Sequence, residues 1–193
     1  MKLYDYQKEG VRWILSRGRG FLWDEPGLGK TIQAIVAAKN LGGPVLVVCP
    51  NSLKGWWRSE IRRLYPNDHV ITAGVGGRFP GMRPLSELAQ NGNFPWWTIV
   101  HYTGLRINTD EYNRILWKTV VCDEVHYIKN RKAKRTKAVK QVTPIHCNRI
   151  GLTATPFSTN PADLWSQLRW MEPHVDALRS YWKFYDTFVD YEL

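Results

Sequence analysis

The sequence predicts a single three-layer α/β domain in which helices cover both faces of a mainly parallel β-sheet. Short apolar runs alternate with segments of helical length along the 193 residues. The run PVLVVCP, residues 44–50, is apolar at almost every position, which is typical of a parallel strand buried on both faces. With 44% hydrophobic and 23% charged residues, the composition is that of a globular protein that can bury a core.

The first elements are a helix, a short strand and a second helix. Residues 6–16 are amphipathic because Val11, Ile14 and Leu15 share one face, and the glycines at 18 and 20 end this helix. An apolar strand then begins at Phe21 and leads through a glycine-rich turn into the next helix.

The remainder of the chain continues the alternation. Residues 51–66 predict a helix with Asn51 or Ser52 as its cap and Pro66 as its stop. A helix is expected between residues 103 and 116, and the carboxyl end has Leu164, Leu168 and Met171 at helical spacing. A Gly/Pro-rich loop over residues 74–84 precedes a short helix at 85–90. The other expected strands are HVITAG (69–74), WWTIVHY (96–102), KTVVCDE (118–124) and NRIGLTATP (148–156).

Charge and cysteine content restrict the compartment and the partners. Lys and Arg exceed Asp and Glu by ten, which is expected of a protein that meets a polyanion. The amino terminus has no apolar signal region and no run is long enough to span a membrane. Cys49, Cys122 and Cys147 lie far apart without metal-site spacing, so a reducing, intracellular compartment is expected: cytoplasm, nucleus, or the host cytoplasm if the protein is viral.

The stretch DEPGLGKT has the residues of a phosphate-binding turn. A strand, a glycine-rich turn and a helix aim backbone N–H groups and the positive end of the helix dipole at one point. Gly27 and Gly29 permit the turn, Lys30 can reach the terminal phosphates and the Thr31 hydroxyl can ligate Mg²⁺. Asp24 stands where the strict pattern GxxxxGK(S/T) has its first glycine, so an ordinary turn is the alternative.

A second motif, TVVCDEVH, supplies the partner that phosphoryl transfer needs. It is an apolar strand that ends in two carboxylates, which should emerge at the carboxyl edge of the sheet beside the phosphate-binding turn. Asp123 is the expected Mg²⁺ partner, and Glu124 is the expected base for the attacking water. The alternative is a strand capped by two solvated acids.

Five segments together carry a resemblance to a known family. They are DEPGLGKTIQ, VCPNSLKGWWRSEI, IVHYTGLR, VVCDEVHYIKN and GLTATPFSTNPADLW, and YQKEGVRW precedes them. In order and approximate spacing the chain resembles the first, RecA-like lobe of the SWI/SNF-type DNA translocases of helicase superfamily two. This resemblance implies one ATP-binding domain over residues 1–193 that uses ATP and Mg²⁺ and moves on duplex DNA, independent of sequence, when paired with a second lobe.

The resemblance also implies residue roles. Gln7 looks like the glutamine that reads adenine, and His126, in a DExH box written here as DEVH, looks like the link from the nucleotide to Thr153 and Thr155, which couple ATP state to lobe movement. Positions that match nucleic-acid contacts in the family are Ser52, Lys54, Tyr102 and Thr103. The segment after DEVH lies near the family's nucleic-acid face, which adds Arg131, Lys132, Lys134 and Arg135; a solvated helix face is the alternative for this basic run.

Departures from the family pattern bear on activity. Pro26 replaces a methionine and Ala154 a glycine, and neither removes a ligand. The family's later motifs do not follow before Leu193, including the arginines that complete the ATP site, so we expect the chain alone to hydrolyse ATP poorly and to need a second lobe in cis or in trans. Two other functions stay open: an RNA or forked-DNA helicase lobe, and a non-motor module that binds ATP and DNA. The adjacent tryptophan pairs 56–57 and 96–97 are expected to pack in the core with one member each.

Overall fold

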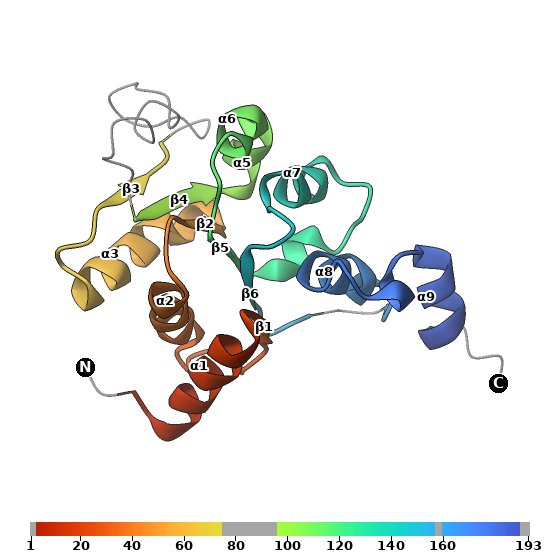
Figure 1. Cartoon of the computed structure of the whole chain (residues 1–193), viewed down its shortest axis with the longest axis horizontal. Coiled ribbons are helices and arrows are strands. Elements are labelled where there is room, and N and C mark those ends of the chain that lie inside the picture. The colour runs from red at the N-terminus through yellow and green to blue at the C-terminus, as the bar shows by residue number, and fades with distance from the viewer. Residues whose placement is uncertain (1–2, 75–95, 157–159, 190–193) are drawn as a thin grey trace.

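The computed structural model describes residues 3–74, 96–156 and 160–189 (Figure 1). Six strands form one sheet in the order β1-β6-β5-β2-β4-β3, and all neighbouring pairs are parallel. The expected α/β fold with a parallel sheet is therefore confirmed. The strands are β1 (Arg19–Leu22), β2 (Val45–Cys49), β3 (Val70–Thr72), β4 (Trp97–His101), β5 (Thr119–Asp123) and β6 (Asn148–Leu152).

Helices cover both faces of the sheet (Figure 1). One face carries α1 (Asp5–Arg17), α2 (Lys30–Leu41) and α3 (Lys54–Leu64), and a 3₁₀ turn, η1 (Asn51–Leu53), precedes α3. The other face carries α5 (Tyr102–Ile107), α6 (Thr109–Asn113), α7 (Lys134–Val142) and α8 (Asp163–Met171). The 3₁₀ turns η3 (Val125–Ile128) and η4 (Asp176–Leu178) and the terminal helix α9 (Tyr181–Phe188) complete the described elements.

Strand β2 shows why the continuous apolar run predicts a central strand. All five of its residues are buried, and their side chains alternate between the two cores. Val45 and Val47 pack under α1, α2 and α3, whereas Leu46 and Val48 pack under α5, α7 and α8. Burial on both faces removes the need for a polar position, so the sequence of the strand has no alternation.

Three local expectations were wrong. Leu15 is 36% exposed, and Gln7 takes the third buried position of α1 beside Val11 and Ile14. Neither Asn51 nor Ser52 caps α3, because the 3₁₀ turn η1 intervenes and no side chain bonds to the first turn of the helix. The helix expected over residues 103–116 is broken at Asn108, whose backbone leaves the helical region at φ −116° and ψ 32°.

The tryptophan pairs divide as expected. Trp57 and Trp97 are fully buried, whereas Trp56 is 56% exposed. The loop and short helix expected between residues 74 and 90 lie outside the described residues, except for Gly74. Among the described helices, none is both long and apolar enough to cross a membrane.

Candidate functional site

The predicted motifs meet at the carboxyl edge of the sheet. In the ladder, Leu22 and Asp123 are each in register with Leu152, so β1, β5 and β6 end at the same level. The phosphate-binding turn follows β1, DEVH follows β5, and TATP follows β6. In a parallel sheet this edge is where ligands bind, because loops there diverge from a common end.

The turn after β1 has the backbone of a phosphate cradle. Gly27 and Gly29 have φ values of +85° and +75°, which side chains rarely allow. A Cβ at position 29 would lie 2.5 Å from the Gln7 amide nitrogen, so the turn also needs glycine for a close approach. Helix α2 begins at Lys30, and the N–H groups of its first turn have no partners within the helix. Residues at this turn therefore fit a bound polyphosphate.

Lys30 stabilises the turn itself. Its ammonium donates to the carbonyl oxygens of Asp24 at 2.6 Å and Glu25 at 3.0 Å. The Asp24 carboxylate, at the position of the missing glycine, accepts a hydrogen bond of 2.8 Å from Gln33. Thr31 follows as the second residue of α2 and is half-buried. A phosphate group would replace two neutral carbonyls with a charged acceptor for the same ammonium.

Gln7 joins the first helix to the turn. Its amide nitrogen donates to the Leu28 carbonyl at 3.2 Å, and its amide oxygen accepts from the Tyr4 N–H at 3.1 Å. The side chain is 5% exposed, while the stacked rings of Tyr4 and Tyr6 beside it are 69% and 46% exposed. A polar side chain thus lies directly over the phosphate turn.

Asp123 is a buried carboxylate with a defined set of donors. One oxygen accepts from the Trp57 indole at 2.7 Å and the other from the Glu124 N–H at 3.0 Å. Burial raises the pKa of Asp123, while the Trp57 hydrogen bond and the charge of Lys30 lower it. Asp123 and Lys30 are therefore electrostatically coupled although they belong to different motifs.

The residues of the site can hold Mg²⁺ only together with the phosphates of a bound nucleotide. The described residues contain no group of three His, Cys, Asp or Glu side chains that could hold a metal by themselves. Mg²⁺ is commonly held by one or two carboxylates together with substrate phosphates and water. Asp123 and the Thr31 hydroxyl would be the protein ligands, and the phosphates would supply the others.

Trp57 is the residue that the sequence pattern did not indicate as part of the site. The adjacent pair 56–57 shows only that one ring faces the core, and the bond to Asp123 joins residues 66 positions apart. The indole N–H satisfies a carboxylate oxygen that would otherwise be buried without a donor.

We expect Trp57→Phe to lower the free energy of unfolding by about 1–3 kcal/mol, because it leaves the Asp123 oxygen without its donor. Urea denaturation measures this. Trp56→Phe, on the exposed face of the same helix, is the matched control and should change stability by less than about 0.5 kcal/mol. Equal losses in both variants would contradict the assigned role.

Glu124 belongs to a hydrogen-bonded group with His126 and Thr153. The Thr153 hydroxyl donates to the Glu124 carboxylate at 3.1 Å and lies 2.9 Å from His126 Nδ1. His126 Nδ1 is also 3.2 Å from the same Glu124 oxygen. Which partner donates between His126 Nδ1 and the Thr153 hydroxyl depends on the tautomer of the imidazole ring. The Thr155 N–H donates to the Thr153 hydroxyl at 3.1 Å.

The backbone at Glu124 supports this arrangement. Glu124 is the single non-glycine residue with positive φ, at +49°, in the described part of the chain. Such a conformation is uncommon for glutamate and is stabilised here by its surroundings. It turns the chain sharply after β5, so that Asp123 and Glu124 face different partners. The structure thus brings together the predicted residues Glu124, His126, Thr153 and Thr155.

The residues expected to contact nucleic acid follow β2 and β4 at the same edge. Ser52 and Thr103 are exposed, and Lys54 donates to the Ala73 carbonyl at 2.8 Å. Tyr102 differs, because it is 4% exposed and its hydroxyl donates to the Asp123 carbonyl at 2.7 Å. Its side chain supports the end of β5 from within the core.

The basic run follows β5. Lys132, Lys134 and Arg135 are exposed, and Arg131 is half-buried with its guanidinium 4.3 Å from the centre of the Tyr181 ring. Arg135 donates to the Tyr127 carbonyl at 2.7 Å. Two arginines are therefore held in place while the lysines extend into solvent.

Comparisons with known proteins show the family of the chain. The profile of the SNF2-related domain matches residues 6–190. A "SWI/SNF-related matrix-associated actin-dependent regulator of chromatin subfamily A-like protein 1 homolog" from Caenorhabditis elegans is 33% identical over 171 residues, which cover 87% of this chain and 24% of that protein. The "ATP-dependent DNA helicase DDM1" of Arabidopsis thaliana is 34% identical over 188 residues, covering 90% and 24%. The chain thus spans about a quarter of the length of these relatives.

A solved structure supports the same assignment. The Sulfolobus solfataricus SWI2/SNF2 ATPase core in complex with dsDNA superposes with a TM-score of 0.80 and 29% identity, over 97% of this chain and 39% of that chain. The RecA-like fold implied by the resemblance is therefore confirmed. From the match over residues 6–190 and the shared fold, the chain belongs to the family of SNF2-related domains.

Proposed function

We propose that this chain is the ATP-binding lobe of a DNA-dependent ATPase that moves along duplex DNA when paired with a second RecA-like lobe. The observation that supports it most is the convergence of the glycine turn, Asp123 and the group of Glu124 with Thr153 at one edge of the sheet. Turnover of MgATP with and without duplex DNA tests the proposal.

Each residue of the site has a role in hydrolysis. Bound ATP would supply the phosphoryl group that is transferred to water, and bound Mg²⁺ would supply the positive charge that polarises this group. Lys30 would exchange the carbonyls of Asp24 and Glu25 for phosphate oxygens, and Thr31 and Asp123 would hold Mg²⁺. Glu124, held by Thr153, accepts the proton of the attacking water.

Coupling between nucleotide and movement passes through the hydrogen bonds at Thr153. The hydroxyl of Thr153 contacts Glu124, His126 and the backbone of Thr155, so a change at the base reaches the loop after β6. Gln7 provides a polar side chain for adenine at the other end of the site. These assignments rest on the family motifs and on the contacts described above.

A second lobe completes the ATP site in this proposal. An added arginine that stabilises the negative charge on the transferring phosphate is worth about a thousandfold or more in rate. We therefore expect the isolated lobe, residues 1–193, to bind MgATP and to hydrolyse it slowly. The arginine would come from the second lobe, in cis or in trans. An intracellular location remains a prediction that accords with this role.

Duplex DNA is the proposed track. The solved relative with TM-score 0.80 is described as a complex with dsDNA, and the predicted contact residues lie on segments that follow β2, β4 and β5 at one sheet edge. Ser52, Lys54, Thr103 and the basic run would bind phosphates, with Tyr102 supporting them from the core. Phosphate contacts carry no sequence information, which suits a protein that moves along DNA.

The salt dependence of DNA binding should show whether the basic run contacts DNA phosphates. Replacing Lys132 and Lys134 by glutamine should reduce the slope of log K against log salt concentration by about 0.9 for each phosphate that is no longer neutralised. Fluorescence anisotropy of a labelled duplex at several salt concentrations measures the slope. The control is Arg62→Gln with Arg114→Gln, because these exposed arginines lie on segments that lead to the opposite edge of the sheet. An equal change of slope in both variants would remove the basic run from the interface.

A further inference from the structure

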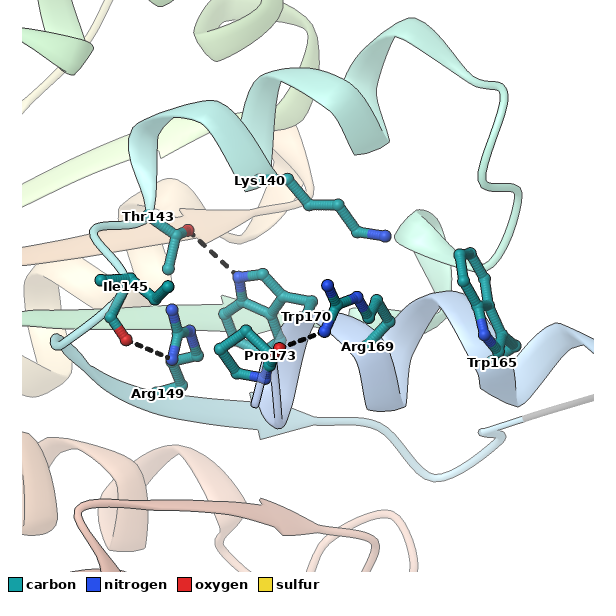
Figure 2. Close-up of a pocket in the computed structure, with 8 residues that line it drawn as sticks. All are labelled: Lys140, Thr143, Ile145, Arg149, Trp165, Arg169, Trp170 and Pro173. Atoms are coloured by element: carbon teal, nitrogen blue, oxygen red, sulfur yellow. Dashed lines mark hydrogen bonds between the residues drawn. The ribbon is translucent and has the colours of Figure 1, made fainter. Parts of the chain in front are cut away.

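A pocket lies between α7, α8 and the start of β6, away from the proposed ATP site (Figure 2). Its volume is about 370 Å³. Arg149 lines it from the amino end of β6, roughly 13 Å along the strand from Thr153 at the rise of an extended chain. The pocket is therefore separate from the residues proposed to hydrolyse ATP. Its other lining residues include Lys140 from α7, with Trp165, Arg169 and Trp170 from α8.

The pocket contains three basic side chains and no acidic one among the described residues that line it. Lys140, Arg149 and Arg169 are the basic residues. Arg169 donates to the Pro173 carbonyl, which Figure 2 shows at the pocket wall. Grouping three cations in a partly enclosed space is unfavourable, since each raises the electrostatic cost of charging the others. Glu172, which is outside the lining, acts favourably on the charge of Arg149.

Arg149 is the central feature. It is 2% exposed, and its two terminal nitrogens donate to the carbonyl oxygens of Ile145 at 3.2 Å and Pro144 at 2.9 Å. Its Nε is buried without a hydrogen-bond partner among the described residues. Buried donors are nearly always satisfied in folded proteins, so an unpaired guanidinium N–H in a pocket indicates a missing acceptor.

Lys140 and Trp165 bring two further donors to the lining of the pocket. The Lys140 ammonium lies 5.1 Å from the centre of the Trp165 ring. Burial lowers the pKa of Lys140 to about 8, and the charge of Arg169 adds to the effect. The Trp165 indole N–H is also buried without a partner in the described structure. The ammonium of Lys140, the guanidinium of Arg169 and the indole N–H of Trp165 thus belong to side chains that line the same pocket.

The pocket also has apolar walls. Ile145, which is 49% exposed, lines it together with Pro173 and the tryptophan rings. Tryptophan and arginine surrounded by apolar contacts are typical of sites that hold a protein ligand. A single carboxylate side chain is narrower than a duplex backbone, so an extended peptide suits a pocket of about 370 Å³ better than a duplex does.

We propose that this pocket binds the carboxylate of an acidic side chain from a peptide segment in which apolar residues flank the acid. The carboxylate would accept from Lys140 and from the Arg149 Nε, and the flanking residues would pack on Ile145 and Trp165. Carboxylates are strong acceptors for guanidinium and ammonium donors, particularly where water is excluded. This site is independent of the ATPase proposed above.

A labelled peptide tests the proposal. The probe is a short, dye-labelled peptide of glutamate and leucine, and the matched peptide has glutamine in place of glutamate. Anisotropy should show binding of the glutamate peptide alone. Lys140→Gln should weaken binding about tenfold or more, because it removes a charge-assisted hydrogen bond. Lys137→Gln, one turn earlier on the exposed face of α7, is the control and should bind as the unaltered chain does.

Competition separates the other candidate ligands. Unlabelled duplex DNA and pyrophosphate should leave the peptide bound, and displacement by either at matched charge would overturn the peptide assignment. Equal binding of the two peptides, or an unaltered affinity in Lys140→Gln, would overturn the proposal that this pocket binds a carboxylate. Far-UV circular dichroism and urea unfolding of Lys140→Gln show that the variant is folded. If that variant unfolds, Trp165→Leu replaces it and should weaken binding, because the flanking residues no longer pack on the indole ring.

Discussion

Replacing Glu124 by glutamine is expected to reduce MgATP turnover by about 10²- to 10⁴-fold and to leave MgATP affinity within about twofold of the unaltered chain. Glutamine keeps an oxygen that can accept the Thr153 hydroxyl, which lies 3.1 Å from the Glu124 carboxylate. It cannot take a proton from water. The variant therefore separates the chemical step from binding, and both are measured on the same preparation paired with a second lobe.

The control for this prediction is an exposed glutamate outside the site. Glu9→Gln, on α1 and outside the site, should leave both turnover and affinity unchanged. Turnover in Glu124→Gln equal to that of Glu9→Gln would contradict the role of Glu124 as the base. A parallel loss of MgATP binding would show instead that Glu124 maintains the site.

Replacing Lys30 by alanine is expected to weaken MgATP binding about tenfold to a hundredfold, and turnover should fall with it. Lys30 is the one cation in the turn of residues 24–31 and would bind the phosphates in the proposed site, and a hydrogen bond to a charged acceptor contributes about 1.5–3 kcal/mol. The fold should persist, because the hydrogen bonds that Lys30 makes in this structure are to two partly exposed backbone carbonyls. Calorimetric titration measures the affinity, and urea unfolding measures the stability.

A lysine on the other face of the sheet serves as the reference. Lys137→Ala, on the exposed face of α7, removes one positive charge from the chain without touching the turn. Its MgATP affinity should equal that of the unaltered chain. Equal affinities for Lys30→Ala and Lys137→Ala would place the nucleotide elsewhere.

The features that the sequence predicts correctly are those set by local patterns. Strand β2 has no polar position because both faces are buried, and this is visible in five consecutive residues. The turn at Gly27 and Gly29 is visible because positive φ favours glycine. Asp123 follows an apolar strand, so its position at the sheet edge follows from the parallel topology.

The features that the sequence does not predict depend on contacts between distant residues. The bond from Trp57 to Asp123 joins two residues whose distance is fixed only when α3 packs on the sheet. Thr153 and Glu124 are 29 positions apart, and a motif can name both without giving the hydrogen bond. Gln7 occupies a buried position of α1 although it is polar, because its amide nitrogen donates a hydrogen bond to the Leu28 carbonyl.

The remaining differences between prediction and structure also cannot be read from a local sequence pattern. The break at Asn108 needs only one residue outside the helical region, and helical spacing continues on both sides of it. The pocket with Lys140 and Arg149 is assembled from α7, α8 and β6, so no segment of the sequence contains its pattern. A basic residue in each of three elements looks like an ordinary solvated charge until the fold brings them together.

The proposal of a duplex-DNA translocase is tested most directly by steady-state ATP hydrolysis of this lobe paired with a second RecA-like lobe. Duplex DNA, single-stranded DNA and RNA of equal length are compared, with Lys30→Ala as the blank. We expect duplex DNA to give the largest stimulation above the blank. Stimulation by RNA or single strands that equals or exceeds that of the duplex would contradict it.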